Sequence, residues 1–514
     1  MPRRLLTLGC VMFFCACGPQ KEKEPNDNYA AAGALRQGKI EGRLSSAGDV
    51  DIYKLEISRD SAVLSLHVGG IRDVDFILGV RDRDQAELKR FDETAAGGDE
   101  EALDIGVHRG FYYIVLSNKN EKADNPEQPY TLTVNLDEPV GREMEPNDVA
   151  AAASRLELPG VTQGHYFPAR NLLSGDTDYM EQDWFRLDVV QPGLFLLNID
   201  FSAVPRIDPI IEIYDANGYK LKEADVGGMD QGESLKNLGV RGPSQLRLRL
   251  RGKHKTGNSQ LPYEILSELL PYQGKAEFEP NDQRSDATPL EGDRVEGTIA
   301  PQADLDWYKV AVTEPAKQIL RAMLDGIDGM DLSLKLCDGM GQVLLENDNM
   351  GAGQPEALSA VGVSQGGYYL VVSEKTGRKA DASKIYTLNK SLVPFQEGLE
   401  FELNDSTAAA QAVKVGESVD GYIAPRGDVD FYQFNVYNKG TVVFELAGVI
   451  NVQFAAVLYD QEYRQSSAWS APQPGESLSF EKELEPGTYF LKLRAAEAGQ
   501  NNTRDKYSLR LKLR

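Results

Sequence analysis

The chain has 514 residues, 41% of them hydrophobic and 26% charged, which is typical of folded soluble protein and too long for one ordinary core. Its formal net charge of −24 argues against binding to nucleic acid or to an anionic membrane surface, because both partners need a basic surface. Three of the four cysteines lie within the first 17 residues and Cys337 stands alone, which excludes a disulfide framework beyond the N-terminus.

The first sixteen residues predict a signal peptide. Arg3 and Arg4 precede an apolar stretch from Leu5 to Ala16, which is too short to span a bilayer as a helix because that takes about 20 apolar residues. The sequence around Cys17 resembles a bacterial lipobox, with small Ala16 just before the cysteine. We therefore expect signal peptide 1–16, lipidated Cys17 and a short tether 17–21, with an ordinary signal peptide cleaved nearby as the alternative.

The residue after Cys17 is Gly18 rather than aspartate, which in Gram-negative lipoproteins usually implies passage to the outer membrane. Stable anchoring needs more than one acyl chain, since a single chain binds a membrane only marginally. The sequence thus predicts an exported protein that is lipid-anchored at the cell envelope, with its first domain close to the membrane.

Two acidic segments recur four times in register along the chain. The first reads Glu-x-Glu-x-Asn-Asp and spans 22–27, 143–148, 277–282 and 400–405. The second has two acids separated by one residue and followed by an aromatic side chain, at 49–53, 181–185, 304–308 and 428–432. The second copy has about ten extra residues around Asn171 to Met180. We therefore expect four copies of one domain, at 22–139, 140–273, 274–396 and 397–514.

Within each copy, short strands are predicted from alternation with period two. Tyr53 to Ile57 alternates, Phe76 to Val80 is a continuous apolar run typical of an inner strand, and Gly110 to Val115 begins with glycine. Each copy closes with a tyrosine-initiated strand such as the one from Tyr130. Many short strands with turn residues between them indicate an all-β fold, here four tandem jelly-roll-like β-sandwich domains.

The units resemble the bacterial pre-peptidase C-terminal domain, a β-sandwich often appended to secreted peptidases, and the related collagen-binding domains of clostridial collagenases. The resemblance covers Glu22 to Arg514 and rests on the Glu-x-Glu-x-Asn-Asp segment, the Asp-x-Asp strand start and the Gly-x-Tyr-Tyr strand. No peptidase domain accompanies the units in this sequence, so the most common context of the family is missing.

The acidic segments suit calcium chemically. Calcium takes six to eight oxygen ligands at about 2.3–2.6 Å, whereas zinc prefers nitrogen and sulfur. In extended chain Glu-x-Glu places both carboxylates on one side, and Asp-x-Asp does the same. The alternative is that Asn-Asp merely caps turns or the start of the alanine-rich stretch that follows.

In the related collagen-binding domains this segment binds calcium together with acids near the Asp-x-Asp turn. Carried over to the four copies, the resemblance implies these ligands: Glu22, Glu24, Asn26, Asp27 and Asp51; Glu143, Glu145, Asn147, Asp148 and Asp183; Glu277, Glu279, Asn281, Asp282 and Asp306; Glu400, Glu402, Asn404, Asp405 and Asp430. Copy two has Glu181 where the others have aspartate, and copy four has Leu403 where the others have proline.

Other candidate sites give little support for catalysis. No Gly-x-Ser-x-Gly motif occurs, no histidine recurs at a matched position, and there is no phosphate loop or dinucleotide fingerprint. His67 lies in a strand-like run and Cys337 is expected to be a buried thiol. Arg247, Arg249 and Arg251 alternate along one predicted strand. They form either an anion- or glycan-binding face or, as we favour, pairs with neighbouring acids or a plainly solvated face.

These patterns predict a non-catalytic cell-envelope lipoprotein, a calcium-stabilised β-sandwich array for binding or scaffolding a protein or polysaccharide ligand. Each acidic segment lies where one unit ends and the next begins, so a cation there is expected to stiffen the array. The alternative function is an accessory factor that stabilises, holds or inhibits an exported peptidase.

Overall fold

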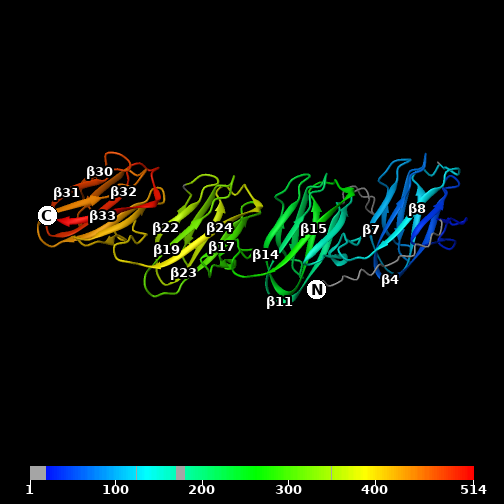
Figure 1. Ribbon diagram of the computed structural model, residues 1–514, viewed down its shortest axis with the longest axis horizontal. Helices are drawn as coiled ribbons and strands as arrows, with labels where there is room; N and C mark the ends of the chain where they lie inside the picture. Colours follow the sequence, from blue (N-terminus) through cyan, green and yellow to red (C-terminus); the bar gives the residue numbers. More distant parts are fainter. Residues whose placement is uncertain (1–18, 123, 169–179, 349) are drawn as a thin grey trace, which may run out of the picture.

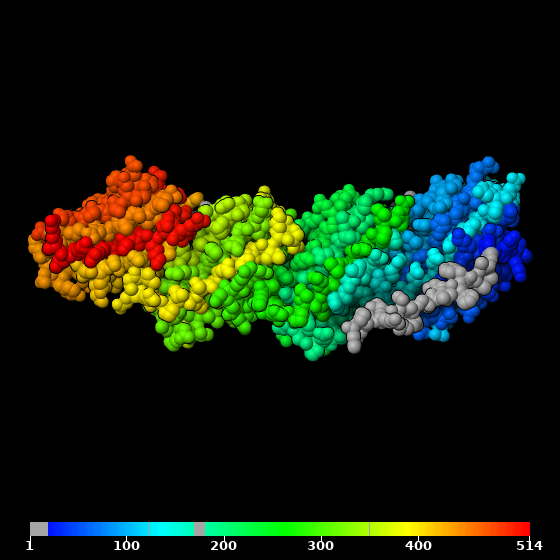
Figure 2. All heavy atoms as spheres, viewed as in Figure 1, coloured from blue at the N-terminus to red at the C-terminus, as the bar shows by residue number. Residues whose placement is uncertain are grey.

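The computed structural model describes residues 19–122, 124–168, 180–348 and 350–514. The predicted signal peptide, Cys17 and nearly all the extra residues of the second copy lie outside these ranges. The described chain forms four β-sandwich domains that follow one another along a single long axis (Figure 1). In a space-filling view they make one continuous elongated body (Figure 2). In these ranges no helix is long and apolar enough to cross a membrane.

The third and fourth domains show the architecture most simply, because each consists of a five-stranded and a four-stranded sheet. In the third domain the sheets are ordered β16-β18-β23-β20-β21 and β17-β24-β19-β22. Its strands are β16 (Thr288–Pro289), β17 (Arg294–Ile299), β18 (Leu305–Val312), β19 (Gln318–Leu324), β20 (Leu332–Cys337), β21 (Val343–Asn347), β22 (Glu356–Val363), β23 (Gly366–Glu374) and β24 (Asp381–Pro394).

The fourth domain repeats this order as β25-β27-β32-β29-β30 and β26-β33-β28-β31. Its strands are β25 (Gln411–Ala412), β26 (Ser418–Ile423), β27 (Val429–Val436), β28 (Gly440–Leu446), β29 (Phe454–Tyr459), β30 (Gln465–Ser470), β31 (Leu478–Leu484), β32 (Gly487–Ala495) and β33 (Asn502–Leu513).

In the first two domains, long bent strands pass from one sheet into the other, so the hydrogen-bonded ladder is continuous. The pairing of β4 with β7 shifts register between Ile57 and Ser61, where both strands change sheets. The first domain comprises β1 (Gln20–Lys21), β2 (Gly33–Leu35), β3 (Gly38–Gly42), β4 (Val50–Val68), β5 (Phe76–Arg81), β6 (Glu87–Phe91), β7 (Glu100–Asn118) and β8 (Tyr130–Asp137). The second comprises β9 (Ser154–Arg155), β10 (Gly160–Tyr166), β11 (Gln182–Phe201), β12 (Pro209–Tyr214), β13 (Lys220–Ala224), β14 (Glu233–Gly252) and β15 (Asn258–Pro271).

Each sandwich has its own hydrophobic core, built by the alternation seen in the sequence. Along β4, Tyr53, Leu55 and Ile57 are buried while the residues between them are exposed. One residue crosses between domains: Phe167 of the second domain belongs to the core of the first and packs edge-on against Phe91, with 5.6 Å between ring centroids. The cores are therefore separate but are linked at the first joint.

The joints between domains share one main-chain arrangement. In copies two to four, the second glutamate of the acidic segment forms a parallel bridge with the bulged strand of the preceding domain, which is β7, β14 or β22. At the first joint, Gly106 N donates to Glu145 O across 2.8 Å and Glu145 N donates to Asp104 O across 2.7 Å. The corresponding bridges at the second and third joints are Leu238 with Glu279 and Val361 with Glu402.

A glycine in each bridging strand lets the next domain approach closely. A Cβ on Gly106 would lie 2.8 Å from Met144 Cβ, and one on Gly362 would lie 2.5 Å from the ring of Phe401. The fourth domain has Glu483 in place of this glycine. Its ladder pairs Thr441 with Glu483, whereas the matching pair in the third domain is Ile319 with Gly362. The bridging surface of the first three domains is thus altered in the fourth.

Candidate metal centres

Folding brings the two acidic segments of every copy together. Carboxylate oxygens of three acids per copy lie within 4.8 Å of one another. These groups are Glu22, Glu24 and Asp51; Glu143, Glu145 and Asp183; Glu277, Glu279 and Asp306; and Glu400, Glu402 and Asp430. Oxygens on opposite sides of a calcium ion are separated by about 4.6–5.2 Å, twice the usual ligand distance. The spacing is therefore that of a cation-binding cluster.

A main-chain hydrogen bond fastens the first acidic segment to the strand that begins in the second. In the first copy Ile52 N donates to Asn26 O across 3.1 Å, and in the fourth copy Phe431 N donates to Asn404 O across 3.0 Å. Trp184 and Trp307 donate to the matching asparagines in the other two copies. Because the strand residue next to each donor is the aspartate of the cluster, this bond sets the distance between the two segments.

The asparagine of each segment is buried and its amide oxygen has no hydrogen-bond partner. Asn26, Asn147, Asn281 and Asn404 are all fully buried, and Oδ1 is unpartnered in every one. In the first copy Asn26 Nδ2 donates to Glu22 Oε1 across 2.9 Å, which fixes the amide plane. A buried amide oxygen without a partner costs free energy of about 1–3 kcal/mol, so its recurrence in all four copies makes it a candidate ligand atom for a cation.

The aspartate of each cluster repeats the pattern. Tyr130 donates its hydroxyl to Oδ2 of Asp51 across 2.6 Å, and Tyr386 and Tyr507 bond in the same way to Asp306 and Asp430. The other oxygen, Oδ1, is buried and unpartnered in all four copies. Each copy thus presents two buried oxygens, one amide and one carboxylate, that no protein group satisfies.

The first glutamate of each segment is held on both carboxylate oxygens by the protein. In the first copy Glu22 Oε1 accepts from Tyr53 and Asn26, and Oε2 accepts from Arg43 N across 2.7 Å. Gly42 precedes Arg43 in the chain. A Cβ on Gly42 would lie 2.4 Å from the hydroxyl of Tyr130, so only glycine fits there. The first glutamate therefore orients the asparagine and the tyrosines around the cluster rather than offering a free oxygen.

The second glutamate keeps one oxygen available. Its Oε2 accepts the main-chain N–H of the asparagine two residues later, with 3.1 Å in both Glu24 and Glu402. In Glu402 the other oxygen, Oε1, is buried without a partner. Because the same residue makes the main-chain bridge to the preceding domain, the cluster and the joint share one residue.

Two kinds of residue at these clusters were not assigned from the sequence. The tyrosines come from strands about 80 residues away and were predicted only as strand starts. The first acid of the second segment also lies at the cluster, and Glu279, Asp282 and Asp304 form a further group within 4.8 Å. The equivalent residues are Asp49, Glu181 and Asp428. Their repetition in the aligned copies is the signal that could have identified them.

Burial and mutual repulsion make these carboxyl groups hard to ionise without a cation. Burial, followed by the charge of Glu22, raises the pKa of Asp51 to about 9. Burial and the charge of Glu279 raise the pKa of Glu277 to about 7. In the fourth copy burial and the neighbouring Glu400 hold the pKa values of Asp428 and Asp430 well above the usual range. A bound cation would reverse this effect.

In the second copy a lysine of the preceding domain enters the cluster. Lys89, on β6 of the first domain, pairs through Nζ with Glu145 Oε1 and with Glu181 Oε1, the latter across 3.1 Å. Its side chain is 3% exposed and both carboxylates are fully buried. Burial alone would lower the pKa of Lys89, but the charges of Glu145 and Glu181 outweigh it and raise the value above that of free lysine.

In the third copy Lys222, on β13 of the second domain, does the same. Its Nζ lies 2.9 Å from Glu279 Oε2, and its side chain is 7% exposed. Burial opposes its charge, and the nearby Glu279 and Asp304 more than compensate, so its pKa is raised. Two of the four clusters therefore contain an ammonium group supplied by the neighbouring domain.

Strand register identifies the positions in the third and fourth domains that are equivalent to Lys89 and Lys222. Lys89 pairs with Val80 and Lys222 with Ile213, each just before a register shift in its hairpin. The corresponding pairs are Leu336 with Leu345 in the third domain and Leu458 with Ser467 in the fourth. At this position the third domain has Leu345, which packs against its own core, in place of a lysine.

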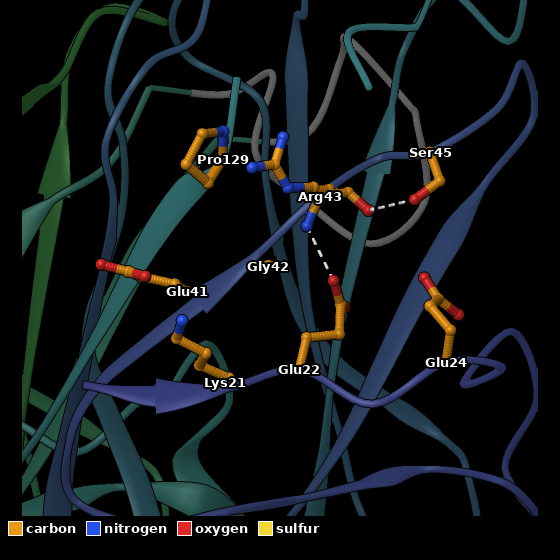
Figure 3. A pocket seen from close by; sticks show the side chains of 8 residues that line it. All are labelled: Lys21, Glu22, Glu24, Glu41, Gly42, Arg43, Ser45 and Pro129. Carbon is orange, nitrogen blue, oxygen red and sulfur yellow. Dashed lines mark hydrogen bonds between the residues drawn. The ribbon is translucent and has the colours of Figure 1, made fainter. Parts of the chain in front are cut away.

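The first cluster is the most open. Glu24 is exposed, and Glu22 and Glu24 point to the same side of their segment, along a hollow of 270 Å³ (Figure 3). The hollow is also lined by Lys21, Arg43 and Ser45. Because no described domain precedes this one, its cluster faces solvent where the others face a joint.

The donor set fits calcium better than a transition metal. Each cluster offers carboxylate and amide oxygens, the ligands that calcium prefers. The histidine nearest to a cluster, His165, turns its Nδ1 to Asp104 of the first domain at 2.6 Å, and only its main-chain N–H contacts Glu143. The fully buried, unpartnered oxygens give the strongest local reason to place a cation there.

The turn-capping alternative receives less support from the geometry. After the acidic segments of copies two and three come short 3-10 turns, η1 (Ala150–Ala152) and η3 (Arg284–Asp286), and neither has a side-chain cap hydrogen bond. The asparagine amide is instead turned inward, toward the cluster. The peptide bond after the second glutamate is cis in all four copies, including Glu402–Leu403.

Three other predicted features are located by the structure. Arg249 and Arg251 pair with the buried Glu212, and Arg247 donates to Ala216 O, so this strand face is paired with its neighbours as we favoured. Cys337 is buried as expected. His67 lies on β4 with Nε2 3.2 Å from Asp99.

No known family profile and no curated protein sequence matches this chain. Among solved structures, the pre-peptidase C-terminal domain of a Bacillus anthracis collagenase is similar over 20% of this chain and 94% of that one, with 18% identity and a TM-score of 0.17. An archaeal virus turret protein with a triple jelly roll covers 69% of this chain and 88% of its own, with 11% identity and a TM-score of 0.20. The similarity to the BSP domain of a biofilm-associated protein covers 94% of this chain and 97% of that one, with 9% identity and a TM-score of 0.13.

Proposed function

We propose that this protein is a non-catalytic, calcium-binding rod of four β-sandwiches, displayed at the cell envelope as a lipoprotein, where it binds or scaffolds a protein or polysaccharide. One observation carries the calcium proposal: the asparagine and aspartate of every cluster each leave one buried oxygen unpartnered. Random packing would not leave the same two atoms unsatisfied four times.

The position of the clusters supports a mechanical role for the cation. In copies two to four the second glutamate contributes its side chain to the cluster and its main chain to the bridge with the preceding domain. A cation that binds the carboxylate restrains the main chain, because only three bonds separate the carboxylate carbon from Cα. Calcium would also cancel the repulsion among carboxylates that burial intensifies. We therefore propose that calcium stiffens the rod.

The elongated shape supports a binding or scaffolding role. A row of domains presents a long surface to a partner, as repeat proteins do (Figure 2). The basic residues and apolar stretch before Cys17 support export and lipid anchoring. Substitution Cys17→Ser should move the protein from the membrane fraction to the soluble fraction; membrane association that persists in this variant would contradict the anchor.

The calcium proposal is tested by calorimetric titration of the chelated chain from residue 19 to 514, together with thermal unfolding in calcium and in chelator. At free calcium a hundredfold above Kd, binding adds about 2.7 kcal/mol to the domain concerned, so its transition should rise by several degrees. Asp51→Asn combined with Asp430→Asn should remove most of the effect. Absence of heat and an unchanged transition in the unmodified chain would refute calcium binding.

Partner binding is tested separately by cosedimentation with insoluble polysaccharide and with fibrous protein. The proposed role predicts retention on one of these polymers, weakened when chelator loosens the rod. A chain that remains in the supernatant with every polymer would leave scaffolding without support.

A further inference from the structure

The ammonium groups of Lys89 and Lys222 lie against the second glutamate of the clusters in copies two and three and bring positive charge to them, while the asparagine and aspartate Oδ1 atoms of these copies stay unpartnered. In the fourth copy Glu402 Oε1 is buried and unpartnered. In the second copy the equivalent atom, Glu145 Oε1, accepts from Lys89. Lys89 therefore satisfies the oxygen that the fourth copy leaves free. In the third copy Lys222 lies against the other oxygen, Glu279 Oε2, and Glu279 Oε1 stays unpartnered.

We infer that Lys89 and Lys222 are built-in cations that replace calcium in the second and third copies, so that the joint between the third and fourth domains is the one that calcium controls. This inference rests on the proposed function, because it assigns the calcium to particular copies. The first copy, which faces solvent, is the other calcium site.

The surroundings of Lys89 show a site built for the lysine. Its ammonium group lies over the ring of Phe167, with Nζ 4.3 Å from the ring centroid. Phe167 in turn lies in the core of the first domain beside Phe91. The ammonium group is thus carried into the cluster by a packed side chain, and a buried ammonium held by two carboxylates leaves little attraction for a second cation.

The cluster of the fourth copy has no such partner in the described part of the chain. The register of β21 places Leu345 where the first two domains have lysine. Burial and then the charge of Glu400 raise the pKa values of Glu402, Asp428 and Asp430, with no nearby cation among the main influences. A buried set of like charges needs a counter-ion, and a divalent cation is the one that its free oxygens can surround.

The main-chain contacts at the third joint agree with this assignment. The first and second joints each have two hydrogen bonds in their bridge, whereas at the third joint only Gly362 N to Glu402 O, 2.8 Å, is made among the described residues. Phe401 packs against Phe395, and Lys317 lies 4.4 Å from the Phe401 ring centroid, outside the cluster. Binding of calcium to Glu402 would therefore add the restraint that lysine gives to the other joints.

The test counts calcium ions on the chain from residue 19 to 514 after equilibrium dialysis, in the unmodified chain and in three variants. We expect two ions in the unmodified chain. Lys89→Met combined with Lys222→Met should bind more than two, and Leu345→Lys should bind one. Lys414→Met, which removes an exposed lysine, is the matched control and should leave the count at two.

Limited proteolysis provides a second readout that does not need the double variant to fold. In chelator, cleavage should increase between Phe395 and Phe401 and remain unchanged at the first two joints. Leu345→Lys should make the third joint resistant to chelator. Equal sensitivity of all three joints, or a third joint in Leu345→Lys that still opens in chelator, would overturn the inference.

The counts separate failure of this inference from failure of the proposed function. Three or four ions on the unmodified chain would leave the proposed function intact and overturn the lysine assignment. No calcium on any variant, including the one that lacks both lysines, would refute the proposed function itself.

Discussion

The hydroxyl of Tyr130 donates a hydrogen bond of 2.6 Å to Oδ2 of Asp51, and so leaves Oδ1 of that aspartate as the oxygen that points into the cluster. The tyrosine begins the last strand of its domain, and the same pairing recurs in the third and fourth domains. A group outside the acidic segments thus decides which aspartate oxygen is available.

Tyr130→Phe should destabilise the first domain without changing its packing volume. It leaves Asp51 Oδ2 without its buried donor, at a cost of about 1–3 kcal/mol, while the Tyr53 hydroxyl keeps its hydrogen bond to Glu22. Chemical denaturation of the chain from residue 19 to 514, monitored by the transition of the first domain, measures the effect. Tyr219→Phe, at an exposed tyrosine, is the control and should be neutral. Equal midpoints for the two variants would contradict the role of Tyr130.

Asn404→Ala should weaken calcium binding to the fourth domain, because it removes the amide oxygen and the bond from Nδ2 to Glu400. We expect the Kd to rise on the order of 10- to 100-fold. Asn147→Ala makes the same change in the lysine-filled second cluster and should leave the calcium isotherm unaltered. Calorimetry compares the two; a similar loss of affinity in both would show that the clusters are equivalent.

Gly362→Ala should disturb the third joint, since its Cβ would lie 2.5 Å from the ring of Phe401. We expect faster proteolysis between the third and fourth domains and a larger spread of shapes in small-angle X-ray scattering. Gly367→Ala, on the neighbouring strand β23 with open space at the Cβ position, should behave like the unmodified chain. Identical scattering from the two variants would argue against close approach at this joint.

The pair of Glu212 with Arg249 predicts a pH dependence of stability. Burial by itself would raise the pKa of Glu212, but the hydrogen bonds from Arg249 and Tyr214, together with the charges of Arg249 and Arg251, outweigh burial and lower it. The pair therefore stabilises the fold at pH values above the pKa of unfolded glutamate, about 4.3, and this contribution is lost as the pH falls through the lower folded value.

Glu212→Gln should therefore cost on the order of 3 kcal/mol at pH 7, because it leaves a partly buried guanidinium without its counter-charge. The difference from the unmodified chain should shrink below about pH 4, where glutamate is protonated in the unfolded chain. Denaturation midpoints at a series of pH values measure this. A difference that stays constant with pH would indicate that the side chain matters for packing and not for charge.

Cys337 should resist thiol reagents in the native state. It is buried on β20, and burial raises its pKa, so the reactive thiolate is both inaccessible and scarce. In the chain from residue 19 onward it is the sole cysteine, and its labelling rate reports unfolding of the third domain. Rapid labelling without denaturant would contradict the burial of this strand.

The sequence predicted the features that depend on local pattern and repetition. Alternation such as that from Tyr53 to Ile57 gives strands with one buried face, and the in-register acidic segments indicated a repeated sandwich in which both segments meet. These predictions follow from side-chain periodicity and from comparing copies, and neither needs knowledge of distant contacts.

The contacts that could not be predicted join residues far apart in the chain. Tyr130 and Asp51 are brought together only by the order of strands in the sheet, and Lys89 reaches Glu181 across a domain joint. The lysines could have been noticed as a pattern, because Lys89, Lys222 and Leu345 occupy one register position in their domains. The function of this position becomes apparent only from the structure of the joint, which shows which cluster lies nearby.

The bridge at each joint has a consequence for how the rod carries load. When the chain is pulled from its two ends, tension passes through every domain in series, and within a sandwich it is spread over ladders such as the one between β11 and β14. Between domains it meets one short parallel bridge and a few side-chain contacts, such as Phe167 and the ion pairs of Lys89 and Lys222. The joints are therefore the weakest links in extension, and they can give way and re-form one at a time while the sandwiches stay folded, so that the rod absorbs a sudden pull by lengthening.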